Sequence, residues 1–138
     1  MKRDLEKSML SVLRIAAAFM FVTFGAMKVL ALPTGPGPAG AAARFLSFVW
    51  FGGLLELVGG GMMLVGLFTR PVAFVLSGEM AVAYFTTHFP LGFWPTLNGG
   101  VPAALYSFLW LYFSVAGGGA WSLDAVLERR LAANAKIK

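Results

Sequence analysis

The stretch FLSFVWFGGLLELVGGGMMLVGLFT, residues 45–69, decides the fold of this chain. Its only charged side chain is Glu56, which stands near the middle of the apolar run. An α-helix of about 20 mostly apolar residues crosses the ~30 Å hydrocarbon core of a bilayer. The stretch therefore predicts a membrane-spanning helix that carries one carboxylate.

The composition of the whole chain supports the same conclusion. Of its 138 residues, 59% are hydrophobic and 12% are charged, whereas about 25% of the residues of a soluble domain are charged. A soluble domain of this size cannot bury so much apolar surface. We therefore expect an all-α integral membrane protein, with the lipid bilayer as its first partner and residues 1–138 forming a single transmembrane domain.

Three further apolar segments flank the first one and are separated by Pro- and Gly-rich breaks. The predicted four-helix bundle has its spans at about 9–32, 45–69, 71–88 and 101–116. A short amphipathic helix over about 122–134, with Ser122 as its N-cap, is expected to lie on the inner leaflet. The alternative for this last segment is a frayed soluble tail.

The basic residues fix the expected orientation. Most of them lie near the two ends of the chain: Lys2, Arg3, Lys7 and Arg14, then Arg129, Arg130, Lys136 and Lys138. An even number of spans puts both ends on one side, and clustered Lys and Arg mark the cytoplasmic side. We expect a multi-pass membrane protein with both termini cytoplasmic. No base-reading motif accompanies these charges, so no nucleic acid is expected as a partner.

Two acidic residues lie inside predicted spans. A carboxylate at mid-bilayer costs roughly 3 kcal/mol on insertion scales, so Glu56 and Glu79 must be protonated or face the interior of the bundle. Counting 1.5 Å per residue, Arg14 lies about 8 Å and Glu79 about 12 Å from the same membrane edge. Arg14 is therefore the predicted partner of Glu79, and it could also reach Glu56, which is expected near the midplane.

Lys28, His88 and Asn98 are predicted at the opposite, outer end. Each has a simpler alternative role: Lys28 and Arg14 could extend to lipid headgroups, and His88 could be only a hydrogen-bonding loop residue. A buried Arg–Glu pair could also be purely structural. The glycines that flank Glu56 either allow close helix packing or leave space for the flat ring of a ligand.

Several long motifs resemble those of the DoxX family of small bacterial membrane proteins. They are RIAAAFMFVTFGAMK (14–28), GGLLELVGGGMMLVGLFTRPVAF (52–74), GEMAVAYFTTHFPLGFWPTLNGG (78–100) and WSLD (121–124). The family takes its name from a subunit of an archaeal thiosulfate:quinone oxidoreductase. Other members are linked to oxidative-stress defence in membrane complexes with a sulfurtransferase and a superoxide dismutase.

This resemblance implies a quinone-linked redox component of the bacterial inner (plasma) membrane. The candidate catalytic residues, which would move protons, are Glu79, Glu56 and His88; the candidate ligand-binding residues are Arg14, Lys28, Tyr84, Trp94 and Asn98. The chain has no cysteine and one histidine, and it shows no metal, haem or flavin motif. Electrons would therefore have to come from a partner subunit or a bound cofactor such as a quinone.

The main alternative is a non-enzymatic membrane scaffold that recruits soluble redox enzymes through its cytoplasmic tails. A small transporter with Arg14 and Lys28 as an anion path is a third hypothesis, although the sequence shows no inverted repeat. Homo-oligomerisation is expected in each case, because four glycine-rich helices bury little surface on their own.

Overall fold

Helices account for most of the residues that the structure, a computed structural model, describes, namely residues 1–135. The α-helices are α1 (Lys2–Leu30), α2 (Phe48–Val65), α3 (Thr69–Ala83), α4 (Pro95–Asn98), α5 (Val101–Ala116) and α6 (Leu123–Ala135). A π-helical turn (Tyr84–His88) and short 3₁₀ turns at Pro38–Gly40 and Phe89–Leu91 complete the elements. No β-strand occurs among the described residues, so the all-α prediction is confirmed. Of the predicted basic tail, Lys136 and Lys138 lie outside the described residues.

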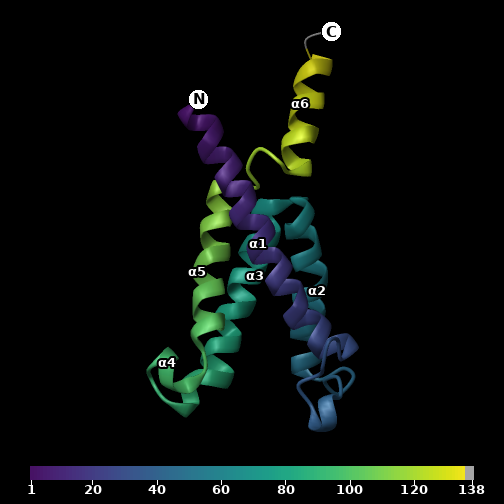
Figure 1. The fold of residues 1–138 in the computed structure, drawn as a ribbon, viewed down its shortest axis with the longest axis vertical. Helices are drawn as coiled ribbons and strands as arrows, with labels where there is room; N and C mark the ends of the chain where they lie inside the picture. Colours follow the sequence, from purple (N-terminus) through teal and green to yellow (C-terminus); the bar gives the residue numbers. More distant parts are fainter. Residues whose placement is uncertain (136–138) are drawn as a thin grey trace.

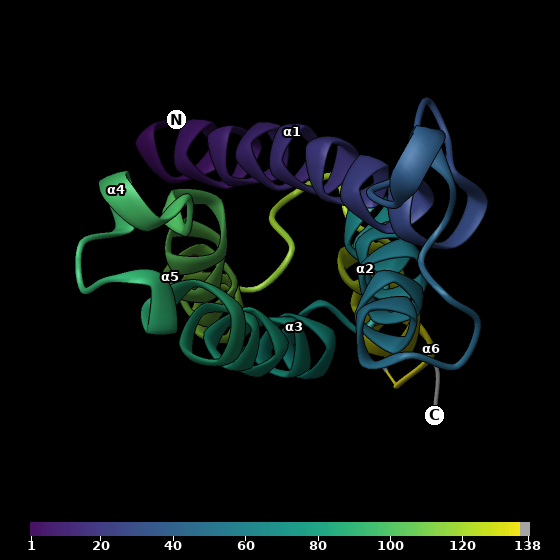
Figure 2. The same ribbon diagram turned by 90° about the horizontal axis from the view of Figure 1, so that it is seen from below.

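The four longer helices α1, α2, α3 and α5 lie side by side, and both chain ends are at the same end of the molecule (Figure 1). In the view along the bundle, α1 and α3 lie on opposite sides, with α2 and α5 completing the ring (Figure 2). The closest pairings are α1 with α2 and α3 with α5. We call the end with the two termini the Arg14 end and the opposite end the cavity end.

The helix boundaries follow capping signals in the sequence. Ser47 caps α2 by accepting a hydrogen bond from the backbone N–H of Trp50 at 3.2 Å. Gly66 ends α2 in the left-handed conformation, with φ of 72°, where a glycine is favoured. Helix α3 begins at Thr69, so the break between α2 and α3 is short.

The predicted segments differ from the observed helices mainly at their ends. The first helix begins earlier than predicted, at residue 2, and the second covers 48–65 in place of 45–69. The third leaves α-helical geometry at Tyr84 and continues as a π turn to His88. Helix α5 has the predicted bounds, and α4 forms inside a segment that was predicted to be a loop.

Helix α6 forms close to the predicted position, and Ser122 caps it by accepting from the backbone N–H of Ala125 at 3.2 Å. It projects away from the bundle along the long axis of the molecule (Figure 1). This direction differs from the predicted one, in which the helix lies across the end of the bundle on the inner leaflet.

Glycines let α1 and α2 cross at short distance. A Cβ atom at Gly25 would overlap the backbone of Leu57, and one at Gly53 would come within 2.5 Å of the Cβ of Lys28. A Cβ at Gly60 would come within 2.9 Å of Val22. Of the two uses considered for the glycines, close packing thus accounts for Gly53 and Gly60.

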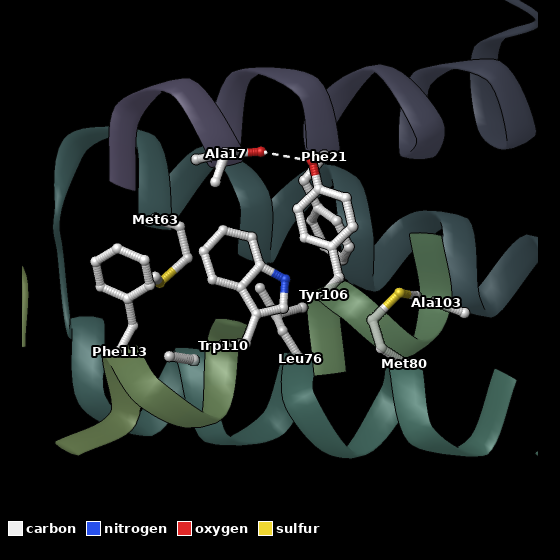
Figure 3. Packing of buried hydrophobic residues seen from close by; sticks show 11 residues of the cluster. Ala17, Phe21, Met63, Leu76, Met80, Ala103, Tyr106, Trp110 and Phe113 are labelled. Atoms are coloured by element: carbon white, nitrogen blue, oxygen red, sulfur yellow. Dashed lines mark hydrogen bonds between the residues drawn. The ribbon is translucent and has the colours of Figure 1, made fainter. Parts of the chain in front are cut away.

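An aromatic core fills the middle of the bundle (Figure 3). Trp110 of α5 packs edge-on against Phe21 of α1, with ring centroids 5.3 Å apart. Tyr106, one turn away from Trp110, donates from its hydroxyl to the backbone oxygen of Ala17 at 3.2 Å. Met63 and Leu76 bring α2 and α3 into the same cluster, so all four longer helices share one core.

Two helices, Lys2–Leu30 and Phe48–Val65, are long and apolar enough to cross a membrane, and Val101–Ala116 is a shorter apolar helix. The structure thus supports two candidate spans directly, fewer than the four predicted.

Candidate functional site

A buried ion pair joins α1 to α2 near the cavity end. The Nζ atom of Lys28 lies 2.6 Å from Oε1 of Glu56, and the Glu56 side chain is only 2% exposed. Two glycines make the approach possible, since Gly25 and Gly53 each stand three residues before one member of the pair, on the same helical face. The second carboxylate oxygen of Glu56, Oε2, is buried and has no hydrogen-bond partner.

Glu79 does not contact Arg14, so the predicted Arg14–Glu79 pair is wrong. The Glu79 carboxylate instead faces α2, where its Oε1 would be 3.3 Å from a Cβ atom at Gly52. Its Oε2 is buried without a hydrogen-bond partner. Gly52 is one helical turn from Glu56, so Glu79 lies beside the Lys28–Glu56 pair in the cavity-end half of the bundle.

A cavity of about 240 Å³ opens next to this ion pair. Its lining comes from every longer helix and from the π turn: Phe24, Lys28, Glu56, Met80, Ala83, His88, Gly99, Pro102, Ala103 and Tyr106. Pockets for small molecules are typically apolar with a few polar groups, and this lining has that character. The structure thus brings three predicted site residues, Lys28, Glu56 and His88, to one cavity.

The His88 ring is hydrogen-bonded to the backbone of the segment that follows it. Its Nδ1 lies 3.1 Å from the backbone oxygen of Asn98, and a carbonyl can only accept, so Nδ1 is the N–H donor. In the neutral tautomer that has this donor, the lone pair is on Nε2. Only Nδ1 is bonded to the Asn98 backbone, so this bond does not use Nε2.

Asn98 fixes this arrangement and is itself 7% exposed. Its Nδ2 donates to the backbone oxygen of Gly92 at 2.7 Å, and its Oδ1 accepts from the N–H of Gly100 at 2.8 Å. The Tyr84 ring stacks on that of His88 with centroids 6.4 Å apart. Tyr84 and Asn98 therefore position His88, and neither lines the cavity.

Trp94 lies outside the site. Its side chain is 62% exposed, and it packs edge-on against Phe93, with ring centroids 5.1 Å apart. It does not line the cavity, so its predicted place in the ligand-binding set does not match the structure. An exposed aromatic pair at this end is typical of a membrane–water interface.

Arg14 occupies the other end of the bundle and is 0% exposed. Its guanidinium donates to four backbone oxygens from three parts of the chain: Gly118 at 2.8 Å, Leu64 and Trp121 each at 2.7 Å, and Met63. With its N–H groups so engaged, Arg14 has a structural role. It neither extends to headgroups nor lines the cavity, so the structure places it apart from the other predicted ligand-binding residues.

Residues of the WSLD motif complete this end of the bundle. Both carboxylate oxygens of Asp124 accept backbone N–H groups at the start of α3, from Phe68 and Thr69, each at 2.8 Å. The hydroxyl of Ser11 accepts from the N–H of Trp121 at 3.0 Å. Asp124 thus caps α3 from a position far along the chain, a role that the sequence did not reveal.

The cavity lining offers a distinct set of polar groups. Lys28 retains N–H donors beyond the one directed at Glu56, while Glu56 Oε2 is buried without a hydrogen-bond partner and has no surface that a ligand can reach. Tyr106, which sequence reasoning missed, donates its proton to Ala17. The site can therefore hydrogen-bond a small ring that carries oxygen substituents, and it has groups that can accept protons.

Four longer helices around a mostly apolar cavity with an ion pair in its wall define a helical bundle protein with a buried interior site. Residues 9–89 match the DoxX family, and this chain belongs to that family of membrane proteins. An uncharacterized protein of Haemophilus influenzae is 44% identical over 119 residues, covering 83% of this chain and 87% of that protein. No solved structure matches the chain.

Proposed function

We propose that this DoxX family member is a four-span protein of the bacterial inner membrane that acts as a quinone-linked redox component. The observation that carries the proposal is the cavity at Lys28, Glu56 and His88, which combines an apolar wall with a cation, a carboxylate and an imidazole. Quinone reduction and quinol oxidation each move two protons with two electrons. Glu56, Glu79 and His88 lie where they can exchange such protons.

Four spans are supported by the exposed apolar surface of the shorter helices. Phe74 of α3 is 66% exposed and Phe108 of α5 is 72% exposed, which is costly in water and favourable in lipid. Helix α3 has 15 residues and the π turn adds 5, a column of about 30 Å at 1.5 Å per residue. Helix α5 is shorter, and local thinning of the bilayer can accommodate it.

The orientation follows from the shared position of the two chain ends (Figure 1). Because the basic residues gather at that end, we place it in the cytoplasm. The cavity then lies toward the outer face, near the exposed pair Phe93 and Trp94, which suits the outer interface.

The electrons must enter through another molecule, since the chain has no cysteine. We propose soluble redox enzymes, of the sulfurtransferase or superoxide dismutase type implied by the family resemblance, as partners at the cytoplasmic end. The chain would then serve as the quinone-binding subunit of an oxidoreductase with a role in oxidative-stress defence. Self-association is proposed as well, because Gly78 leaves open space on the surface of α3.

The experiment that tests the site is extraction of lipids from protein purified out of its own membrane. Mass spectrometry should find a quinone at near-stoichiometric amounts, and a variant with both Lys28→Met and Glu56→Met should lose it. A matched control, Arg3→Met, changes an exposed cation and should retain the quinone. If wild-type and doubly substituted protein carry the same amount, the cavity is not the quinone site.

The scaffold is the second candidate function, and helix α6 favours it. A groove of about 820 Å³ lies between α6, the start of α1 and the connection before α6, and it is lined by charged residues of both signs: Asp4, Lys7, Arg70, Asp124, Glu128 and Arg129. Such a groove offers a docking place for a soluble enzyme. Under this alternative, the carboxylates inside the bundle have no part in the partner's activity.

Two variants separate the candidates. Glu79→Gln keeps the size of the side chain and removes its ability to carry a charge. It should abolish quinone-coupled turnover in the purified complex while leaving the folded fraction unchanged. Deleting residues 125–138 should instead release the soluble partner. Unchanged turnover with Glu79→Gln, combined with loss of turnover on deletion, would support the scaffold and contradict the redox site.

A further inference from the structure

We propose that the ring ligand of the cavity carries a hydrocarbon tail, and that this tail leaves the cavity sideways, between α1 and α5, into the bilayer. The inference rests on the proposed function, in which the cavity is the quinone site. It adds the class of substrate, a ring with a long apolar tail, and the route by which the ring enters. It follows from the size of the cavity, the exposure of its lining and the surface beside its opening.

The cavity has room for one ring and for little more. Its volume is about 240 Å³, below the roughly 300–1,000 Å³ that is usual for the sites of drug-sized molecules. An apolar cavity of about 150 Å³ in another protein holds a benzene molecule. A substituted ring therefore fits inside, and a tail of several isoprene units attached to that ring has to lie outside.

The exposure of the lining residues shows where the cavity opens. Glu56 of α2 is 2% exposed and Met80 of α3 is 5% exposed, so the cavity is covered on the side of these two helices. Phe24 of α1 is 38% exposed, and Gly99 and Pro102, at the start of α5, are exposed as well. Because these three residues also line the cavity, the opening lies between α1 and the start of α5.

The course of α1 accounts for this opening. Helix α1 lies near α5 at the Arg14 end and crosses to the side of α2 toward the cavity end (Figure 1, Figure 2), where Gly25 and Gly53 allow it to pack closely on α2. The Phe24 ring still packs edge-on against the Tyr106 ring of α5, with centroids 6.4 Å apart. Beyond this contact the two helices diverge, and the opening begins there.

The opening faces lipid in the proposed four-span arrangement. Tyr106 lies five residues after the start of α5, about 8 Å inside that helix at 1.5 Å per residue. Met20, one helical turn from Phe24, is 53% exposed. Leu105, three residues after Pro102, is 63% exposed. A charged substituent would be costly beside these side chains, so an apolar tail is the substituent that fits.

The test is photolabelling of the full-length protein in lipid nanodiscs. The probe is a decyl-benzoquinone whose tail ends in a diazirine, and the competitor is an excess of tail-less dimethoxy-methyl-benzoquinone. We expect the labelling that the competitor removes to lie mainly on α1 and α5, at exposed positions such as Met20 and Leu105. Competitor-sensitive labelling mainly elsewhere in the chain would overturn the inference and leave the quinone site intact. Absence of competitor-sensitive labelling would overturn the proposed function together with the inference.

Single cysteines test the opening independently, because the chain has no cysteine of its own. In Phe24→Cys, a bulky maleimide on the thiol should block the opening and lower decyl-benzoquinone binding at least tenfold relative to the unmodified variant. Phe74→Cys carries the same group on an exposed position of α3, where binding should change less than twofold. Pro102→Cys tests the opening from α5 if Phe24→Cys does not fold. Equal binding by the modified and unmodified opening variant, or an equal loss in Phe74→Cys, would contradict this route.

Discussion

The two ends of the bundle bury charge in opposite ways. At the Arg14 end, the guanidinium donates to four backbone oxygens, and Asp124 accepts two backbone N–H groups. At the cavity end, Glu56 and Glu79 each keep one buried carboxylate oxygen without a partner, and a cavity of about 240 Å³ lies beside the Lys28–Glu56 pair.

This difference separates structure from function within one small protein. A buried polar group that satisfies its hydrogen bonds inside the chain holds the fold together, because breaking the set leaves several groups unpaired. An ion pair in the wall of a cavity has bonds left for a ligand, because Lys28 keeps N–H donors beyond the one directed at Glu56. Substitutions at the Arg14 end should therefore lower the stability of the fold. Substitutions at the cavity end should instead weaken ligand binding and change the stability little.

The largest loss of stability is expected for Arg14→Met. Four backbone oxygens would lose a donor, and each unsatisfied buried group costs about 1–3 kcal/mol. We expect a loss of at least about 4 kcal/mol, so that little folded protein is recovered. The measurement is the folded fraction after purification, followed by thermal unfolding monitored by circular dichroism.

The control for Arg14→Met is Arg3→Met, which removes an exposed arginine from the same helix. It should unfold within about 0.5 kcal/mol of the wild type. Equal stability of both variants would show that the Arg14 bonds do not hold the helices together.

A smaller loss is expected for Gly66→Ala, where the backbone has φ of 72°. The added Cβ would lie 2.5 Å from the Cβ of Ser122 and 2.9 Å from Cζ of Arg14. Strain and overlap together should cost roughly 2–4 kcal/mol. The matched control is Gly61→Ala in α2, which has no neighbour within 4 Å and should be neutral or up to about 1 kcal/mol more stable. Similar unfolding temperatures for the two alanine variants would contradict the packing at Gly66.

Replacing both members of the ion pair at the cavity end should affect stability least among the buried charges. In the double variant Lys28→Met/Glu56→Met, two apolar side chains of similar size replace a buried pair, a change that is often neutral or stabilising. We expect the unfolding free energy to stay within about 1 kcal/mol of the wild type or to increase, while quinone binding is lost. A loss comparable to that of Arg14→Met would show that both ends serve the fold, and retained binding would show that the pair is not part of the site.

The smallest effect is expected for Trp94→Ala. Its side chain is 62% exposed and lies outside the cavity, so the affinity for a quinone in detergent should change less than twofold. Titration of the variant beside the wild type measures this. A loss of tenfold or more would bring Trp94 back into the ligand-binding set, as the sequence predicted.

Helix positions could be predicted from the sequence because apolar runs and breakers are local signals. The partner of Arg14 could not, because its acceptors are backbone oxygens, which have no signature in the sequence, and one of them is 104 residues away. Counting depth along separate helices led to Glu79 as the partner, since such counting ignores rotation about the helix axis. A local signal for the true pair did exist, with Gly25 three residues before Lys28 and Gly53 three residues before Glu56.

The central claim is that the cavity beside Lys28, Glu56 and His88 binds a ring ligand. An experimental density map of the protein purified from its own membrane tests this claim most directly. The account predicts a flat ring inside the cavity, with oxygen substituents within hydrogen-bond distance of Lys28 Nζ and His88 Nε2. Density for water molecules alone, or a cavity closed by its own side chains, would contradict it.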